Sequence, residues 1–178
     1  MPAIDSVEVV TRAGERICLG PLRGAEPEEL FVLFGEVVAS GDGFPQAPPL
    51  TRAVFAATWV DTVTVVVGAR PVAGGPLLGA YYLKPNFAQR AGQIANAGYV
   101  VQEAARGRGV GRALVADSVW RAPLLGFAAI QFNLVFESNP ARKLYEELGW
   151  TEIGRIPEAV DGEPALIYWR RVGPTSAL

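Results

Sequence analysis

The chain has 178 residues, of which 50% are hydrophobic and 19% charged, and its formal net charge is -2. This length and composition are typical of one globular domain with a substantial core. The small negative charge argues against a general nucleic-acid binder, because such domains usually carry a basic excess. The chain has no histidine and a single cysteine, Cys18, which excludes Ser-His-Asp and Cys-His catalysis and any zinc site built from histidine or several thiolates.

The sequence also lacks the signals that would direct the chain to a membrane. No apolar run approaches the ~20 residues that a membrane helix needs, and the first ten residues, MPAIDSVEVV, lack the pattern of a signal peptide. A lone thiol is typical of a reducing compartment. We therefore expect a cytoplasmic protein without a metal site that binds neither membranes nor nucleic acids. Its four tryptophans permit a homodimer without requiring one.

The first half of the chain predicts short strands around one helix. Pro27, Glu28 and Glu29 suit the first turn of a helix, and apolar residues follow at helical spacing up to Gly41. The segment 41–50 contains three prolines and predicts a surface loop that borders a ligand site. Strands are predicted at residues 7–10, 16–19, 62–67 and 77–83.

The second half predicts an alternation of strands and helices. A strand is predicted over residues 94–102, and Gly98 inside it indicates a bulge or a close backbone approach. Alternation in the strand 128–136 places Phe132 and Leu134 on one face and Asn133 on the other. Further elements are a helix from residue 112 towards Pro123, a helix from Asn139 to Gly149, and strands at 150–156 and 165–172.

This order of elements predicts an α/β (α+β) fold with a mixed central sheet and a parallel pair of strands at its centre. We expect a single domain over residues 1–172, followed by a frayed tail at 173–178.

The segment RGRGVG, residues 106–111, joins the end of a strand to the start of a helix. Amide groups at a helix start lack internal partners, and the helix dipole adds partial positive charge. Glycine lets the backbone approach a ligand closely. The segment and the next residue supply three cations and predict a pyrophosphate site, formed by Arg106, Gly107, Arg108, Gly109, Val110, Gly111 and Arg112. The same residues would also suit a solvated basic turn.

A dinucleotide site is a second alternative for this segment. The fingerprint G-x-G-x-x-G is not met, because the third glycine comes one position early. Such sites also open a doubly wound parallel sheet, whereas hairpin-like strands come first here.

Together, the glycine-rich segment and the later run NPARKLYEELGW, residues 139–150, resemble the GCN5-related N-acetyltransferase (GNAT) superfamily. The resemblance is strongest over residues 94–156. It implies a largely antiparallel sheet with a splayed parallel pair and helices on both faces. Acetyl-CoA would bind as co-substrate between strands 95–101 and 129–135.

The resemblance also implies how each part of acetyl-CoA is held. The pyrophosphate would lie on the amides of residues 107–111, and Asn139 would contact the cofactor, unless it only caps its helix. An N–H freed by a bulge at Gly98 would stabilise the developing oxyanion. The pantetheine arm would pair with backbone groups of Tyr99, Val100 and Val101.

For catalysis, the resemblance places Tyr145 where the leaving thiolate is protonated, although the residue also suits simple packing. Many members carry a glutamate on the strand before the glycine-rich segment, but residues 94–102 contain no carboxylate. Asn96 stands there instead, and an amide can orient an amine or a water but is not a base. Asn133 would be buried in an apolar strand, where it either satisfies backbone groups or faces the substrate.

The three asparagines Asn96, Asn133 and Asn139 resemble a branch of the superfamily that includes a fungal acetyltransferase of azetidine-2-carboxylate and other proline analogues. This likeness implies a small, amino-acid-like amine as acceptor and direct attack without a covalent enzyme intermediate. Glu137 could hold a cationic amine or be a solvated strand end. The alternatives are a non-catalytic CoA-binding module, an acetyltransferase of peptide or antibiotic amines, and a dinucleotide-dependent oxidoreductase.

Overall fold

The computed structural model describes residues 5–22, 26–41 and 43–173. In chain order its helices and strands are β1 (Val7–Val10), β2 (Arg16–Pro21), α1 (Glu26–Ser40), α2 (Arg52–Trp59), β3 (Val65–Pro71), β4 (Gly79–Pro85), β5 (Ile94–Val101), α3 (Val110–Leu124), β6 (Ala129–Phe136), α4 (Arg142–Glu147), β7 (Thr151–Val160) and β8 (Glu163–Arg171). Short 3-10 turns at Gln89–Ala91 and Glu103–Ala105 flank β5.

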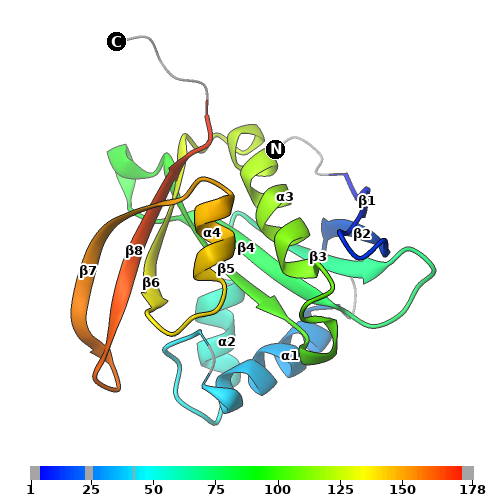
Figure 1. The fold of residues 1–178 in the computed structure, drawn as a ribbon, viewed down its shortest axis with the longest axis horizontal. Coiled ribbons are helices and arrows are strands. Elements are labelled where there is room, and N and C mark those ends of the chain that lie inside the picture. Colours follow the sequence, from blue (N-terminus) through cyan, green and yellow to red (C-terminus); the bar gives the residue numbers. More distant parts are fainter. Residues whose placement is uncertain (1–4, 23–25, 42, 174–178) are drawn as a thin grey trace.

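The described strands form one eight-stranded sheet in the order β1-β2-β3-β4-β5-β6-β8-β7. Every neighbouring pair is antiparallel except β5 and β6, which are parallel (Figure 1). The predicted mixed sheet with one central parallel pair is therefore confirmed.

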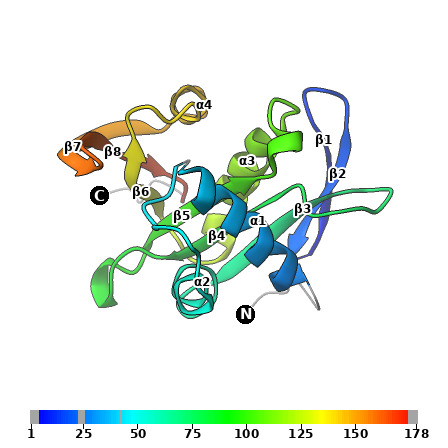
Figure 2. The ribbon, with the colours of Figure 1, turned by 90° about the horizontal axis from the view of Figure 1, so that it is seen from below.

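Helices cover both faces of this sheet, as predicted (Figure 2). On one face α1 and α2 pack Phe34 and Trp59 against Tyr82 of β4 and Val100 of β5. On the other face α3 and α4 join a core that includes Leu114. Because successive side chains of a strand point to opposite faces, the neighbours Tyr81 and Tyr82 enter different cores.

A buried ionic network fixes α3 to the sheet. The Tyr81 hydroxyl donates to Asp117 Oδ2 at 2.7 Å, and Arg121 Nε donates to the same oxygen at 2.7 Å. Arg121 also donates to the carbonyls of Asp5 and Leu19. A buried charge is costly unless it is paired and hydrogen-bonded, and here both conditions are met.

Several element boundaries differ from the prediction. The strands predicted at 62–67 and 77–83 are observed as β3 (Val65–Pro71) and β4 (Gly79–Pro85). The helix α2 was not predicted, although Phe55, Thr58 and Trp59 are buried at helical spacing and Thr51 caps its start. Gly173 donates to the Ala128 carbonyl at 3.1 Å, so the predicted tail begins with a bonded residue. Residues 174–178 lie outside the described part of the chain.

Of the two interpretations of Gly98, a bulge or a close approach to the backbone, the bulge is wrong. β5 pairs with β4 in unbroken register past this residue. Glycine is needed there for a different reason, because a Cβ would lie 2.7 Å from Cε1 of Tyr82. The irregularity lies on β6, between Phe132 and Val135. It shifts the strand's alternation, so that Val135 is buried while Leu134 is only half-buried.

Candidate active site

A cleft opens where β5 and β6 part. The two parallel strands pair only through Ile94 with Ala129 and Ala95 with Ile130. Beyond Ala95, the edge of β5 that faces β6 has no strand pairing among the described residues. The cleft has a volume of about 1450 Å³ and extends from β5 and β6 to α4 and the loop 43–48. A strand edge without a partner offers N–H and C=O groups to an extended ligand.

Asn96 lies at the point where the strands part and joins three of them. Its Nδ2 donates to the backbone carbonyl of Gln131 on β6 at 3.1 Å. Its Oδ1 accepts from the Tyr82 hydroxyl on β4 at 3.1 Å. Burial raises the pKa of the Tyr82 phenol to about 12, so at neutral pH this hydroxyl keeps the proton that it donates. The Asn96 side chain therefore links β5 to β6 by a hydrogen bond just beyond their last backbone pair.

The glycine-rich turn before α3 forms one end of the cleft. Gly107 and Gly109 have φ values of 74° and 89°, which glycine adopts without strain. α3 begins at Val110, so the first amides of the helix lack intrahelical acceptors. Gly107 and Gly111 line the cleft, and a Cβ at Gly107 would meet nothing within 4 Å. This geometry suits an anion.

Of the three predicted cations, only Arg106 lines the cleft. Arg108 points to the β1–β2 turn, where its Nη2 lies 2.6 Å from Glu15 Oε1. Arg112 pairs with Glu147. The other predicted members of the turn face the protein: the Val110 side chain is fully buried, and a Cβ on Gly109 would lie 3.1 Å from Cβ of Thr11. The sequence could not reveal these partners, because they come from distant elements.

Tyr145 lies on α4 and lines the cleft within an aromatic cluster. Its ring centroid is 4.8 Å from that of Phe132, 6.2 Å from that of Trp150 and 6.3 Å from that of Tyr99. Burial raises the pKa of the Tyr145 phenol above its ordinary value. At neutral pH the phenol is therefore protonated and can donate a hydrogen bond into the cleft.

Tyr99, Val100 and Val101, which were expected to pair with the pantetheine arm, all line the cleft. The Tyr99 hydroxyl is already engaged, 2.8 Å from Ser118 Oγ. Ser118 itself donates to the Val115 carbonyl at 2.7 Å, so Tyr99 is the donor in the first bond. The backbone of this segment can therefore supply the donors of hydrogen bonds to a ligand. Burial raises the pKa of all five tyrosines, which are Tyr81, Tyr82, Tyr99, Tyr145 and Tyr168.

Asn133 was expected to be a buried amide, but it is exposed at the cleft's rim. The bulge of β6 turns it away from the core. Its Oδ1 accepts from Asn86 Nδ2 at 3.1 Å and from Gln131 Nε2 at 2.9 Å. Asn133 Nδ2 in turn donates to Asn86 Oδ1. Asn86 is far from Asn133 in the chain and left no local signal, whereas Gln131 lies two residues before Asn133 on the same strand and could have been found from strand alternation.

Asn139 lines the cleft and also shapes the turn before α4. Its Oδ1 accepts from the Ala141 amide at 2.8 Å, and α4 begins at Arg142 rather than at Asn139. The predicted cap is therefore wrong: Asn139 closes a turn before the helix, whereas the N-cap residue of α4 is Ala141, which has no side-chain cap bond. Glu137 pairs with Arg155, which favours its interpretation as a solvated strand end.

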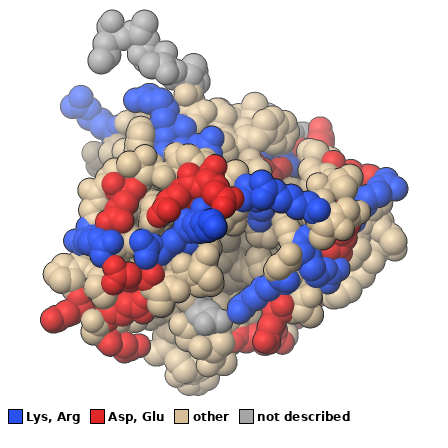
Figure 3. Space-filling view, in the orientation of Figure 1, with Lys and Arg blue, Asp and Glu red and all other residues tan. Residues whose placement is uncertain are grey.

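Other parts of the chain complete the wall of the cleft. The loop 43–48, from the segment expected to border a ligand site, the β7–β8 turn and Lys84 of β4 all line the cleft. On the face drawn in Figure 3, Lys and Arg side chains alternate with Asp and Glu side chains, so charges of both signs border the site.

The residues that the structure describes contain neither a membrane-spanning helix nor a cluster of metal ligands. No helix there combines the length and apolar character that crossing a membrane requires. Nor do those residues contain a group of three or more His, Cys, Asp or Glu side chains that could hold a metal ion.

Comparison with known proteins gives consistent results. A family model described as "Acetyltransferase (GNAT) domain" matches residues 62–152. N-acetyltransferase aca1 of Schizosaccharomyces pombe is 42% identical over 84 residues, which cover 47% of this chain and 40% of that protein. Protein SPT10 of Saccharomyces cerevisiae is 31% identical over 83 residues, covering 46% and 13%. The chain therefore spans less than half the length of these curated relatives.

Solved structures extend the likeness over almost the whole chain. A GCN5-related N-acetyltransferase from Kribbella flavida has 32% identity and a TM-score of 0.80, covering 87% of this chain and 97% of that one. A phosphinothricin acetyltransferase from Sinorhizobium meliloti, in complex with acetyl-CoA, has a TM-score of 0.78 at 21% identity, covering 90% and 91%. The second likeness shows the fold alone.

These matches confirm the predicted enzyme class at the level of the family, and the Sinorhizobium meliloti protein of the same fold binds the predicted co-substrate, acetyl-CoA. The family model spans half of the sequence, including β5, the glycine-rich turn and Tyr145. By this match and by its likeness to the Kribbella flavida enzyme, the chain belongs to the GCN5-related N-acetyltransferase family.

Proposed function

We propose that this protein transfers the acetyl group of acetyl-CoA to the amine of a small, amino-acid-like molecule by direct attack. The observation that carries the proposal is the cleft between β5 and β6, with an anion-binding turn at one end and a wall of amide side chains at the other. The exposed edge of β5 suits the amide-bearing pantetheine arm, and the amides around Gly107 and Gly111 suit the pyrophosphate.

In this proposal the two substrates approach each other from opposite faces of the sheet. Tyr145 and Tyr99 belong to the core on the α3 and α4 side, whereas Tyr82 belongs to the core on the α1 and α2 side. Asn96 contacts Tyr82. We assign the thioester to the first side and the acceptor to the second, so that they meet through the gap between the strands.

In this arrangement the amine nitrogen attacks the thioester carbonyl, an N–C bond forms and the C–S bond breaks. A backbone N–H on the open edge of β5 stabilises the oxyanion. The Tyr145 phenol stabilises the leaving thiolate. Because burial raises the pKa of this phenol, it acts mainly as a hydrogen-bond donor, and solvent completes the protonation.

The asparagines position these groups. Asn96 holds the strands at the apex of the gap through its two hydrogen bonds. Asn133, at the rim, can exchange its contacts with Asn86 for hydrogen bonds to the acceptor. Among the described residues of the cleft wall, only Asp161 and Glu163 are carboxylates, and the proton of the attacking amine passes to water. The cytoplasmic location, the single domain at 1–172 and the homodimer stay predictions.

Two measurements test this proposal. Calorimetric titration with acetyl-CoA measures binding, and thiol release measures transfer to free amino acids, polyamines, aminoglycosides and peptides. If acetyl-CoA binds but no amine in this panel causes thiol release, the result would favour a non-catalytic CoA-binding module. Thermal stabilisation by NADH instead of acetyl-CoA would favour the dinucleotide alternative.

Substitution of Gly111 tests the pyrophosphate site directly. A Cβ there makes only an ordinary contact, 3.6 Å from Val101 Cγ2, and an acid in the first turn of a helix is favourable for stability. Gly111→Glu should therefore fold normally but bind acetyl-CoA about tenfold or more weakly by charge repulsion. Gly111→Gln is the matched control for bulk. Equal affinity of the two variants would contradict the assignment.

A further inference from the structure

Lys84 is a cation in the cleft without a carboxylate partner. It lies at the end of β4, lines the cleft and is half-buried. Its Nζ lies 4.8 Å from the ring centroid of Tyr82, and no ion pair joins it to any described residue. Burial lowers the pKa of this lysine. A partly buried ammonium usually has an anionic partner, so its position here requires an explanation.

The position of Lys84 relates it to the acceptor and not to the pyrophosphate. In the β4–β5 register Lys84 lies opposite Asn96, and Tyr82 lies opposite Gly98. Directly opposite residues have Cβ atoms about 5 Å apart on one face of a sheet. Asn96 marks the point where β5 and β6 part, whereas the glycine-rich turn follows the other end of β5, about 17 Å away at ~3.3 Å per residue.

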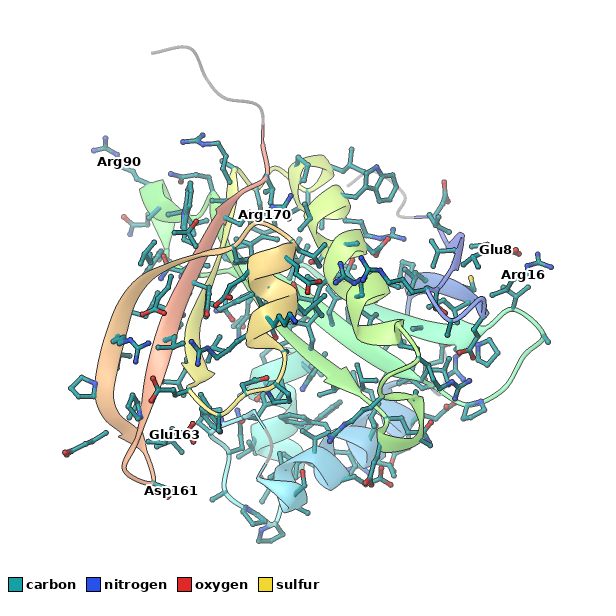
Figure 4. All side chains as sticks on the ribbon, in the orientation of Figure 1. Glu8, Arg16, Arg90, Asp161, Glu163 and Arg170 are labelled. Atoms are coloured by element: carbon teal, nitrogen blue, oxygen red, sulfur yellow. The ribbon has the colours of Figure 1, made fainter. Side chains whose placement is uncertain are left out.

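The opposite charge stands on another wall of the same cleft. Asp161 and Glu163 line it from the β7–β8 turn, and Figure 4 shows both at the tip of that hairpin. Phe44, Pro45 and Pro48 add an apolar wall to the same cleft. A cleft that contains a cation, carboxylates and an apolar surface matches a molecule that carries an anion, an ammonium group and an apolar side chain.

We propose that Lys84 binds the carboxylate of the acceptor and selects amino acids over simple amines. The proposal rests on the acetyltransferase function and adds a specificity residue to it. A single ammonium matches the single charge of a carboxylate, whereas a phosphate dianion generally meets several donors. The ring of Tyr82 contacts the Lys84 ammonium, and the hydroxyl of Tyr82 donates a hydrogen bond to Asn96. Asp161 and Glu163 attract the ammonium form of the acceptor to the cleft.

The test compares matched acceptors with the full chain saturated with acetyl-CoA. The acceptors are L-alanine, L-leucine and L-phenylalanine, each compared with its amide, in which a neutral group of similar shape replaces the carboxylate. A further acceptor is 3-methylbutylamine, which is leucine without the carboxylate. Because the amine pKa differs among these compounds, only the ratio of wild type to variant is compared for each acceptor. The readout is kcat and KM from thiol release.

For Lys84→Met we expect kcat/KM for the preferred amino acid to fall about 10- to 100-fold relative to its amide, mainly through KM. Lys84→Arg should restore most of the preference. Arg90→Met removes a cation at the edge of the molecule, where Figure 4 shows its side chain pointing outward, and should leave the preference unchanged. Titration of N-acetyl-L-leucine and its amide into the CoA-loaded protein measures the same discrimination without turnover.

Three outcomes separate the claims. Equal losses for amino acid and amide in Lys84→Met would overturn the carboxylate assignment. If the wild type acetylates 3-methylbutylamine but no amino acid, and does not bind N-acetyl-L-leucine, the inference fails while the acetyltransferase function stands. If acetyl-CoA itself does not bind, the proposed function fails, and the inference fails with it.

Discussion

Replacement of Asn96 by alanine tests whether this amide holds the two parallel strands together at the apex of the cleft. The change removes the bond to the Gln131 carbonyl and the acceptor of the Tyr82 hydroxyl, each 3.1 Å long. Tyr82 is only 7% exposed. A buried hydroxyl left without a partner costs about 1–3 kcal/mol, and a hydrogen bond contributes about 1 kcal/mol net.

We therefore expect Asn96→Ala to lower the free energy of unfolding by about 2–4 kcal/mol. In a chain of this size each kcal/mol shifts Tm by about 2–4 °C, so the expected fall in Tm is about 4–16 °C. Turnover should fall more than acetyl-CoA affinity, since the glycine-rich turn lies at the other end of β5. Urea unfolding, acetyl-CoA titration and thiol release measure the three quantities.

A double-mutant cycle isolates the bond between Asn96 and Tyr82. Tyr82→Phe removes only the hydroxyl and should cost about 1 kcal/mol. Because the two residues contact each other, the double variant should lose less than the sum of the single losses, with a coupling of about 1 kcal/mol. Strictly additive losses, or an Asn96→Ala variant within 0.5 kcal/mol of wild type, would refute the bridging role.

Four further predictions concern other parts of the site. Tyr145→Phe should slow turnover and leave acetyl-CoA affinity nearly unchanged, as thiol release and titration would show. Arg106→Gln should weaken acetyl-CoA binding more than Arg108→Gln, whose ion pair with Glu15 lies away from the cleft. Gly98→Ala should lower unfolding free energy by about 1–3 kcal/mol, because the new Cβ would displace the Tyr82 ring. Burial raises the pKa of all five tyrosines in the folded protein. Their contribution to the free energy of unfolding should therefore be fully present below pH ~10, and above that pH it should fall by up to about 1.4 kcal/mol per pH unit for each tyrosine.

Each of these has a contrary result. Unchanged turnover would remove Tyr145 from the reaction, and equal losses for the two arginine variants would place both at the pyrophosphate. A Gly98→Ala protein as stable as wild type would show that the Tyr82 ring moves freely. If the free energy of unfolding, measured by urea unfolding, stays constant between pH 10 and pH 12, the raised tyrosine pKa values would be contradicted.

Local sequence determined those features that depend on a few neighbouring residues. The glycine-rich turn was predictable because Gly107 and Gly109 adopt positive φ angles and a helix follows at once. Most of the elements and their order followed from periodicity and from turn residues. With the run at 139–150, these signals were enough to indicate the family and its fold.

Only the tertiary structure decided which side chains share the cleft and what each one contacts. The directions of Arg108 and Arg112 depend on Glu15 and Glu147, and the exposure of Asn133 depends on a bulge that pairing with β8 creates. Asn96 and Lys84 become neighbours through the β4–β5 register. The physical reason is that hydrogen bonds and ion pairs act over a few ångströms in space, whereas the residues that make them are separated along the chain by distances that no local pattern records.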